Sequence, residues 1–182
     1  EPWEFDAAKA VFDEQLAYLR AQKKLLPERI HFGAMLEVPA LAEVLDMLLP
    51  RLSFLSIGTN DLTQFLFAAD RANPKLAERY DWLSTSILRF LRRVMQNAVG
   101  SGVDIGVCGE MGGRRLEALA LMGIGYRRLS ITPAAVGPIK ELVRKVDLAE
   151  LTAAMTGWLA DPALNLREQL AAWADARDIE YD

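Results

Sequence analysis

Three apolar segments of this chain each end in side chains that can bind a metal ion or move a proton. In chain order they are segment 32–36 followed by Glu37, segment 52–58 followed by Asn60 and Asp61, and segment 105–107 followed by Cys108 and Glu110. Short apolar runs are typical of buried strands, and parallel α/β proteins place reactive residues at the carboxyl ends of such strands. We therefore expect these side chains to share one site.

Two of them, Glu37 and Asp61, are carboxylates that could hold Mg²⁺ together. This ion prefers hard oxygen ligands and commonly takes one or two carboxylates, with water and substrate phosphate completing the shell. The alternative is that each acid caps the helix that follows it. An aspartate before a helix is a common N-cap, whereas Glu37 sits inside an apolar run just before Pro39, so capping explains it less well.

Cys108 is the only cysteine of the chain. A thiol is mostly protonated at neutral pH, so it could give a proton to a forming carbanion. Gly106 and Gly109 would let backbone and substrate approach closely, and Glu110 could hold or polarise the thiol. The alternative is an inert cysteine buried as a small apolar side chain.

Two further segments carry arginines that could bind an anion. Arg71 lies in a predicted loop, where it is either a solvated charge or a bidentate clamp for phosphate or carboxylate. The stretch Gly-Gly-Arg-Arg at 112–115 is either a phosphate-binding loop or a turn before the next helix. His31, the only histidine, lies at the entry to a strand, away from the expected site, so we expect no catalytic role for it.

Alternating helical and strand-like patterns place these residues in an α/β fold. We expect helices over 5–24, 41–49, 61–69, 84–99, 115–122, 136–146, 148–159 and 166–177, and strands over 31–38, 52–58, 105–108 and 128–131. This order implies parallel strands joined by right-handed crossovers. An open doubly wound sheet and part of a (β/α)8 barrel both fit. A whole barrel takes about 250 residues, so four strands would make about half of one.

Length and composition indicate one globular domain spanning residues 1–182. The chain is 52% apolar and 25% charged, with a net charge of −4 that argues against nucleic-acid binding. A lone cysteine and the lack of an uncharged apolar run of roughly 18 residues favour a cytoplasmic protein that does not cross a membrane. Because the chain starts at Glu1 without Met, we expect it to be a piece of a longer protein.

Four ordered motifs carry a family resemblance that covers nearly the whole chain. They are Met-Leu-Glu-Val-Pro-Ala at 35–40, Ser-Ile-Gly-Thr-Asn-Asp-Leu-Thr-Gln at 56–64, Asp-Arg-Ala-Asn-Pro at 70–74 and Val-Cys-Gly-Glu-Met-Gly-Gly at 107–113. They resemble the phosphoenolpyruvate-utilising enzymes, and most closely enzyme I of the bacterial phosphotransferase system. Segments 68–74 and 129–138 look like its nitrogen-related form.

The resemblance implies the carboxyl-terminal half of a phosphoenolpyruvate-binding (β/α)8 TIM barrel, with four parallel strands alternating with helices. It implies that Glu37 and Asp61 bind Mg²⁺. It also implies that Asn60 and Arg71 contact the phosphoryl group in transit. Mg²⁺ and Arg71 would neutralise the phosphoryl oxygens, which is the main need of phosphoryl transfer.

The resemblance further implies that Cys108 protonates the enolate when pyruvate forms, supported by Glu110. The phosphoryl group would pass from phosphoenolpyruvate to a histidine on the enzyme's N-terminal domain and then to an HPr-type carrier protein. The family dimerises through this barrel, so a homodimer is expected. The family's other phosphate-binding arginines and its phospho-accepting histidine have no counterpart in this chain, so we expect the chain to be inactive alone.

Two other functions remain as alternatives. Pyruvate phosphate dikinase and phosphoenolpyruvate synthase share similar barrel chemistry, although the loop at 69–74 favours enzyme I. A non-catalytic regulatory or dimerisation module would have no need for Glu37, Asp61 and Cys108 together, and these are all present.

Overall fold

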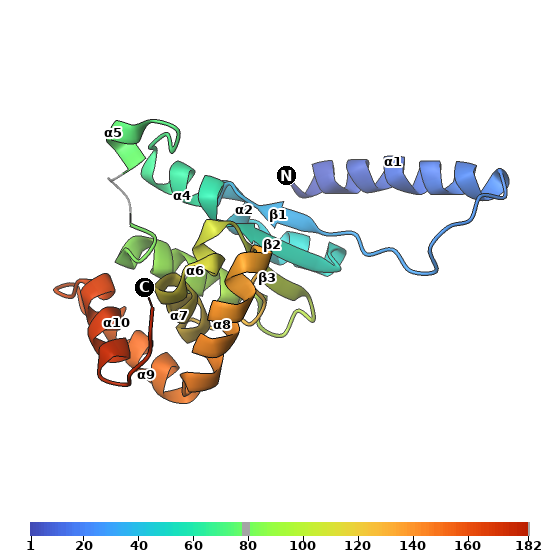
Figure 1. The fold of residues 1–182 in the computed structure, drawn as a ribbon. Helices are drawn as coiled ribbons and strands as arrows, with labels where there is room; N and C mark the ends of the chain where they lie inside the picture. Colours follow the sequence, from blue (N-terminus) through green and yellow to red (C-terminus); the bar gives the residue numbers. More distant parts are fainter. Residues whose placement is uncertain (78–80, 182) are drawn as a thin grey trace.

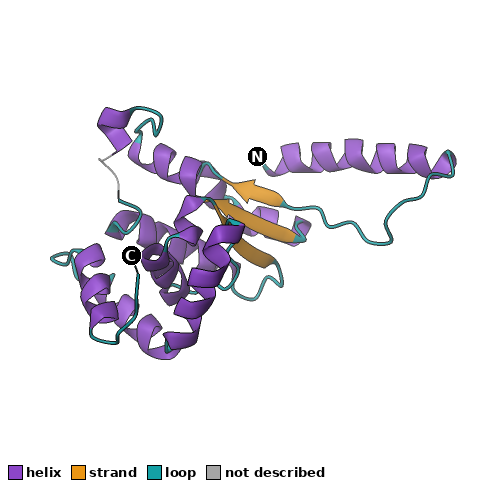
Figure 2. Cartoon of the chain, viewed as in Figure 1, coloured by secondary structure: helices purple, strands orange, loops and turns teal. Residues whose placement is uncertain are grey.

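The computed structural model describes residues 1–77 and 81–181, and Figures 1 and 2 show their arrangement. The elements are α1 (Pro2–Ala21), β1 (Ala34–Leu36), α2 (Pro39–Ala42), α3 (Leu45–Leu48), η1 (Leu49–Arg51), β2 (Phe54–Gly58), α4 (Thr59–Phe67), α5 (Pro74–Ala77), α6 (Thr85–Ala98), β3 (Asp104–Cys108), η2 (Glu110–Gly113), α7 (Arg115–Gly123), α8 (Pro133–Lys145), α9 (Leu148–Trp158) and α10 (Leu166–Asp175). Within these ranges, no helix combines the length and apolarity that crossing a membrane requires.

Three strands form a parallel sheet in the order β1-β2-β3. In the register, Leu36 pairs with Ile57, and Ile57 pairs with Val107. The α/β class and the parallel sheet are therefore confirmed. All three strands point the same way, so their carboxyl ends meet at one edge of the sheet, as expected from the strand-to-helix alternation.

The predicted fourth strand at 128–131 is wrong as a full strand. This segment makes one isolated parallel bridge, between Val107 and Leu129. Two hydrogen bonds hold it: the Val107 N–H donates to the Arg128 carbonyl at 2.9 Å, and the Ser130 N–H donates to the Val107 carbonyl at 2.8 Å. Pro133, which has no N–H, starts α8 directly afterwards. The extended stretch is too short to add a longer ladder.

Two other elements are shorter than predicted. The strand expected over 31–38 is reduced to residues 34–36, although the Ser53 N–H still donates to the Phe32 carbonyl at 2.9 Å just before the ladder begins. The helix expected over 41–49 is divided into α2, α3 and η1. Pro50, which cannot donate a helical hydrogen bond, lies in the last of them.

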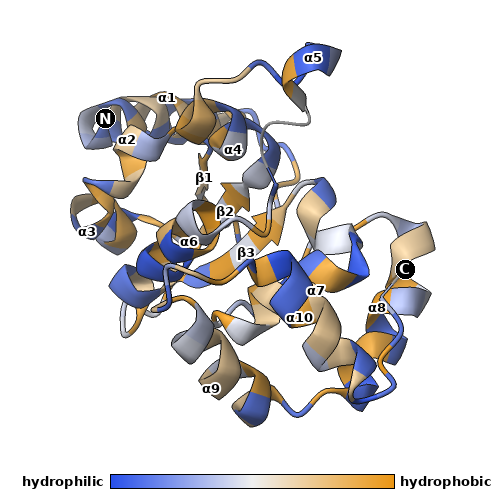
Figure 3. Ribbon diagram, turned by 90° about the vertical axis from the view of Figure 1, so that its left-hand side faces the viewer, coloured by the Kyte–Doolittle hydropathy of each residue, from blue (hydrophilic) through white to orange (hydrophobic). Residues whose placement is uncertain are grey.

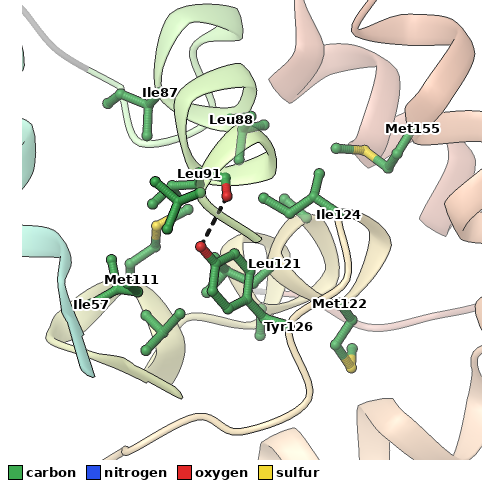
Figure 4. Close-up of a cluster of buried hydrophobic side chains, with 14 of the residues drawn as sticks. Ile57, Ile87, Leu88, Leu91, Met111, Leu121, Met122, Ile124, Tyr126 and Met155 are labelled. Carbon is green, nitrogen blue, oxygen red and sulfur yellow. Dashed lines mark hydrogen bonds between the residues drawn. The ribbon is translucent and has the colours of Figure 1, made fainter. Parts of the chain in front are cut away.

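One face of the sheet is largely buried. Leu36, Ile57 and Val107 are fully covered, and Figure 4 shows Ile57 in a cluster with Leu91 of α6 and Leu121 of α7. Tyr126 lies in the same cluster, where its hydroxyl donates to the Leu91 carbonyl at 2.9 Å. Burial raises the pKa of Tyr126 above its ordinary value. Residues of α6 and α7 pack against this face (Figure 4), and Figure 3 shows the apolar colouring of β2 and β3.

The other face of the sheet is partly open. Met35 and Phe54 are 49% and 41% exposed, although both lie in strands. By strand alternation, Glu37 and Cys108 belong to this same face. Helix α1 does not cover it completely: α1 extends beyond the rest of the molecule (Figure 1), and Phe32 contacts its Phe5 ring at 5.1 Å between centroids.

Candidate functional site

The carboxyl ends of the three strands bring Glu37, Gly58 and Cys108 into one row. Gly58 pairs with Cys108 in the sheet register, and Glu37 follows directly after Leu36, the partner of Ile57. The Glu37 side chain lies over Gly58. A Cβ on this glycine would come within 2.6 Å of the Glu37 Cγ and 2.9 Å of its Oε1. The absence of a side chain at 58 therefore makes room for the Glu37 carboxylate.

The thiol of Cys108 lies at the other end of this row. Its Sγ is 3.5 Å from the Ile57 carbonyl oxygen, to which it donates, and 4.0 Å from the Met35 sulfur. The side chain is half-buried on the open face of the sheet. The Cys108 carbonyl accepts a hydrogen bond from the Thr59 hydroxyl at 3.1 Å, which ties the end of β3 to the start of α4.

Gly109 allows the chain after Cys108 to approach α4 closely. Its φ is +111°, a region that favours glycine. A Cβ here would lie 2.6 Å from the Thr59 Oγ1 and 2.9 Å from the Asn60 Oδ1. The following residue, Glu110, donates its N–H to the Asn60 Oδ1 at 3.2 Å. Because this contact uses the amide oxygen of Asn60, its NH₂ group remains to donate to an anion.

Arg71 reaches back to the first turn of α4. Its Nη2 lies 3.2 Å from the Asp61 Oδ1, and both side chains are partly exposed. Its backbone N–H donates to the Gln64 Oε1 at 3.0 Å, which fixes the loop against α4. The structure thus brings together Asp61 and Arg71, ten residues apart in the sequence, as a charged pair beside the strand ends.

A cavity of about 410 Å³ lies beside this helix start. Its lining residues are Asn60, Arg71, Asp81, Trp82, Glu110, Arg114 and Arg167. Three residues predicted from the sequence therefore meet here, namely Asn60, Arg71 and Glu110. Glu37, Asp61 and Cys108 are not part of this lining. They lie next to it, along the strand ends and the first turn of α4.

Three lining residues were not singled out from the sequence: Asp81, Trp82 and Arg167. The fourth, Arg114, belongs to the Gly-Gly-Arg-Arg stretch at 112–115, which the sequence offered as either a phosphate-binding loop or a turn. Its guanidinium lies 4.8 Å from the centre of the Trp82 ring. Asp81, Trp82 and Arg167 are not part of a local sequence pattern. Arg167 belongs to α10, far along the chain from the other lining residues.

Arg167 joins two acids at the cavity wall. It donates to both carboxylate oxygens of Asp81 at 2.7 and 2.6 Å, and to the Glu117 Oε1 at 2.7 Å. Glu117 is only 3% exposed. Burial by itself raises the pKa of Asp81, but hydrogen bonds from Arg167 and the Leu83 N–H outweigh it, so this pKa lies below its ordinary value. The hydrogen bond to Asp81 is the main reason that the pKa of Arg167 is raised.

The donor set is compatible with a magnesium ion that takes only some of its ligands from the protein. In residues 1–77 and 81–181, no three His, Cys, Asp or Glu side chains gather closely enough to enclose a metal. Glu37 and Asp61 supply two carboxylates, and the bare backbone of Gly58 leaves space for the first of them. Two carboxylates fit an ion that takes its remaining ligands from water and substrate phosphate.

The sequence of this chain is similar to a described protein family and to individual known proteins. The family described as PEP-utilising enzyme, PEP-binding domain, matches residues 1–148. A phosphoenolpyruvate-protein phosphotransferase of Borreliella burgdorferi is 44% identical over 124 residues, which cover 68% of this chain and 22% of that protein. An Escherichia coli protein named phosphoenolpyruvate-dependent phosphotransferase system is 40% identical over 148 residues, or 81% of this chain and 20% of that protein. The chain thus spans about a fifth of the length of these relatives.

Proposed function

The chain belongs to the PEP-utilising enzymes, as their PEP-binding domain, and we propose that it serves phosphoryl transfer from phosphoenolpyruvate in a bacterial phosphotransferase system. The acceptor is a histidine on a separate N-terminal domain of the same enzyme, and an HPr-type protein receives the group next. The observation that carries the proposal is the meeting of Asn60, Arg71 and Glu110 at one cavity, beside the row of Glu37, Gly58 and Cys108.

The open face of the sheet supports a barrel as the complete fold. Parallel sheets are normally covered on both faces, yet Met35 and Phe54 are 49% and 41% exposed on one face here. We propose that residues 1–182 form one domain that corresponds to half of a (β/α)8 barrel. The open face then becomes the barrel interior, and the row that ends in Cys108 lies at its carboxyl-terminal rim, where such barrels hold their substrates.

In this proposal Glu37 and Asp61 hold Mg²⁺, which neutralises charge on the phosphoryl oxygens when it is bound. Asn60 and Arg71 bind the phosphoryl group through the amide NH₂ and the guanidinium. Arg71 already lies 3.2 Å from Asp61, so the proposed phosphate-binding guanidinium and one proposed metal ligand are direct neighbours. Holding these groups in place lowers the barrier by positioning and charge stabilisation.

Cys108 gives the proton that completes the reaction. When the P–O bond of phosphoenolpyruvate breaks, the phosphoryl group goes to the histidine and the electron pair stays on the enolate of pyruvate. The Sγ–H bond then breaks, and its proton forms the new C–H bond at the enolate carbon. The thiolate takes a proton back from water. The carbonyl of Ile57 accepts from the thiol at 3.5 Å and so orients it before the transfer.

The proposal is tested in the complete enzyme that contains this chain. We expect Cys108→Ala to bind phosphoenolpyruvate normally but to lose pyruvate formation by about 100-fold or more, the usual contribution of a general acid. Arg71→Lys should weaken phosphoenolpyruvate binding, because a bidentate clamp becomes a single charge. Unchanged pyruvate formation in Cys108→Ala would exclude the acid role.

We expect the chain alone to bind phosphoenolpyruvate poorly, and micromolar affinity by titration calorimetry would contradict this.

The nitrogen-related form of enzyme I is the subfamily that we propose. The support is the residues at 68–74 and 129–138, which resemble that form. The complete enzyme can be expressed in a bacterial strain that lacks only its own nitrogen-related enzyme I. We expect it to restore phosphorylation of the nitrogen-related HPr-type carrier. Phosphorylation of only the sugar-transport carrier would assign the chain to the other branch.

A further inference from the structure

We propose that Arg114, stacked on Trp82, is a second guanidinium that binds the phosphoryl group of the substrate. This inference rests on the proposed function, but it concerns a residue outside the set that the sequence resemblance assigned. Arg114 lines the same cavity as Asn60 and Arg71. It comes from the N-cap position of α7, so it enters the cavity from a different element than Arg71 does.

The stack on Trp82 holds Arg114 without neutralising it. The guanidinium carbon lies 4.8 Å from the ring centre. A planar cation over an aromatic ring keeps its charge, and its edge N–H groups remain able to donate to an oxyanion. The side chain as a whole is exposed toward the cavity and solvent. Its position is therefore set before any ligand arrives, which lowers the entropic cost of binding.

The other guanidiniums at the cavity are differently occupied. Arg167 is saturated by Asp81 and Glu117, and Arg71 pairs with Asp61. Among the residues that the structure describes, Arg114 makes no ion pair within salt-bridge distance. This leaves it as the lining cation best able to accept a new anion.

The remaining charges of the cavity are consistent with a phosphoryl ligand. Two carboxylates face it, Asp81 and Glu110. Arg167 compensates the first, and Arg71 shares its charge with Asp61 outside the lining, so Arg114 and Glu110 are the lining charges without an ion pair among the described residues. The phosphoryl group has the most oxygens and the most charge in the substrate, and two guanidiniums match it better than the single-charged carboxylate.

Trp82 acts as a positioning residue for Arg114. It follows Asp81 directly, and Asp81 is fixed by Arg167 of α10 and by the Leu83 N–H at 2.9 Å. Arg167 lies beyond residue 148, where the family match ends. The place of Arg114 thus depends on α10, a helix that the family match does not cover.

The test compares Arg114→Gln with Arg128→Gln in the complete enzyme. Arg128 is a matched control, because it forms an exposed pair with Asp104 at the opposite end of β3. A hydrogen bond to a charged group contributes about 1.5–3 kcal/mol, so the KM for phosphoenolpyruvate should rise roughly 10- to 100-fold in Arg114→Gln. The kcat should change much less, since the clamp acts on bound substrate and transition state alike.

A ligand without phosphate separates the two anionic groups of the substrate. Pyruvate binding should be the same in Arg114→Gln and in the control. Equal weakening of pyruvate and phosphoenolpyruvate would place Arg114 on the carboxylate and overturn the proposal. Arg114→Lys, which keeps the charge and loses the planar stack, should give an intermediate KM. Trp82→Leu should raise the KM in the same direction with kcat retained.

Failure of this inference can be told from failure of the proposed function. If Cys108→Ala abolishes pyruvate formation while Arg114→Gln has the KM of the control, only the role of Arg114 is lost. If the complete wild-type enzyme forms no pyruvate from phosphoenolpyruvate, the proposed function itself is wrong. Should Arg114→Gln prove unfolded by circular dichroism, the comparison of Arg114→Lys with the control decides: an unchanged KM there overturns the inference.

Discussion

The carboxylate of Glu37 lies directly over the backbone of Gly58, with 2.6 Å between the Glu37 Cγ and the position that a Cβ at 58 would occupy. No side chain can be added at this position without moving Glu37. The contact joins the ends of β1 and β2, and so it fixes a proposed magnesium ligand relative to the helix that carries the other one.

Gly58→Ala should therefore weaken magnesium binding without unfolding the protein. The new methyl group must displace the flexible end of Glu37, so we expect at least about a tenfold rise in the magnesium concentration needed for half-maximal activity. Gly137→Ala is the matched control, because a Cβ there meets nothing within 4 Å and lies in helix α8. It should leave magnesium dependence unchanged. Equal magnesium dependence in both variants would argue against Glu37 as a ligand.

Gly109→Ala should impair pyruvate formation more than it impairs folding. It combines an unfavourable φ of +111° with a clash against the Thr59 hydroxyl, so the segment that carries Glu110 must move away from Asn60. Gly102→Ala has a similarly unfavourable φ of +74° but open space around it. Both variants should lose roughly 1–2 kcal/mol of stability from backbone strain. Only Gly109→Ala should lose activity as well. Full activity of Gly109→Ala would contradict a role for the contact between Glu110 and Asn60.

The Asp81–Arg167 pair should give the protein a pH-dependent stability. The pKa of Asp81 is lower in the folded protein than its ordinary value of 3.8, so its contribution is fully present above that pH. It disappears as the pH falls through the lowered folded value. In urea unfolding, the stability difference between wild type and Asp81→Asn should be largest near neutrality and shrink below pH 3.8.

Asp104→Asn, which removes the exposed partner of Arg128, is the control for the Asp81 experiment. Its effect on stability should be small at every pH, because exposed ion pairs contribute little. A difference between wild type and Asp81→Asn that stays constant from acid to neutral pH would show that the charge of Asp81 is not the cause.

The chain alone should self-associate. Its open sheet face carries exposed Met35 and Phe54, and unpaired strand edges favour contact with another copy. Sedimentation should show a concentration-dependent increase in mass, reduced by Phe54→Ser on the open face. Val99→Ser, at an exposed site after α6, should have no such effect. A monomer at all concentrations would contradict the expectation.

The sequence was sufficient to predict the strand ends and the residues that follow them. Glu37, Asp61 and Cys108 all lie at or just after the carboxyl ends of parallel strands, because apolar runs ending in glycine and polar residues mark these positions locally. The fourth strand was predicted from its apolar residues alone. Its length depends on the available sheet edge and on Pro133, which an apolar pattern does not record.

The cavity wall could not have been predicted in the same way. Asp81 and Arg167 are 86 residues apart, and each looks like an ordinary surface charge in the sequence. Only the packing of α10 against α7 brings them together with the buried Glu117. Likewise, nothing near Arg114 in the sequence points to Trp82. Long-range pairs of this kind follow from the tertiary structure and carry no periodic signal.

The reach of Arg167 decides where this protein can be shortened. A version cut at residue 148 would keep every motif at the strand ends, yet it would lack Arg167. Glu117 would then lie in the interior without a counter-ion, and Asp81 would lose its ion-pair partner. Expression of the motif-bearing part alone should therefore yield a protein that unfolds at a lower temperature. The last helix is as much a part of the working unit as the strands are.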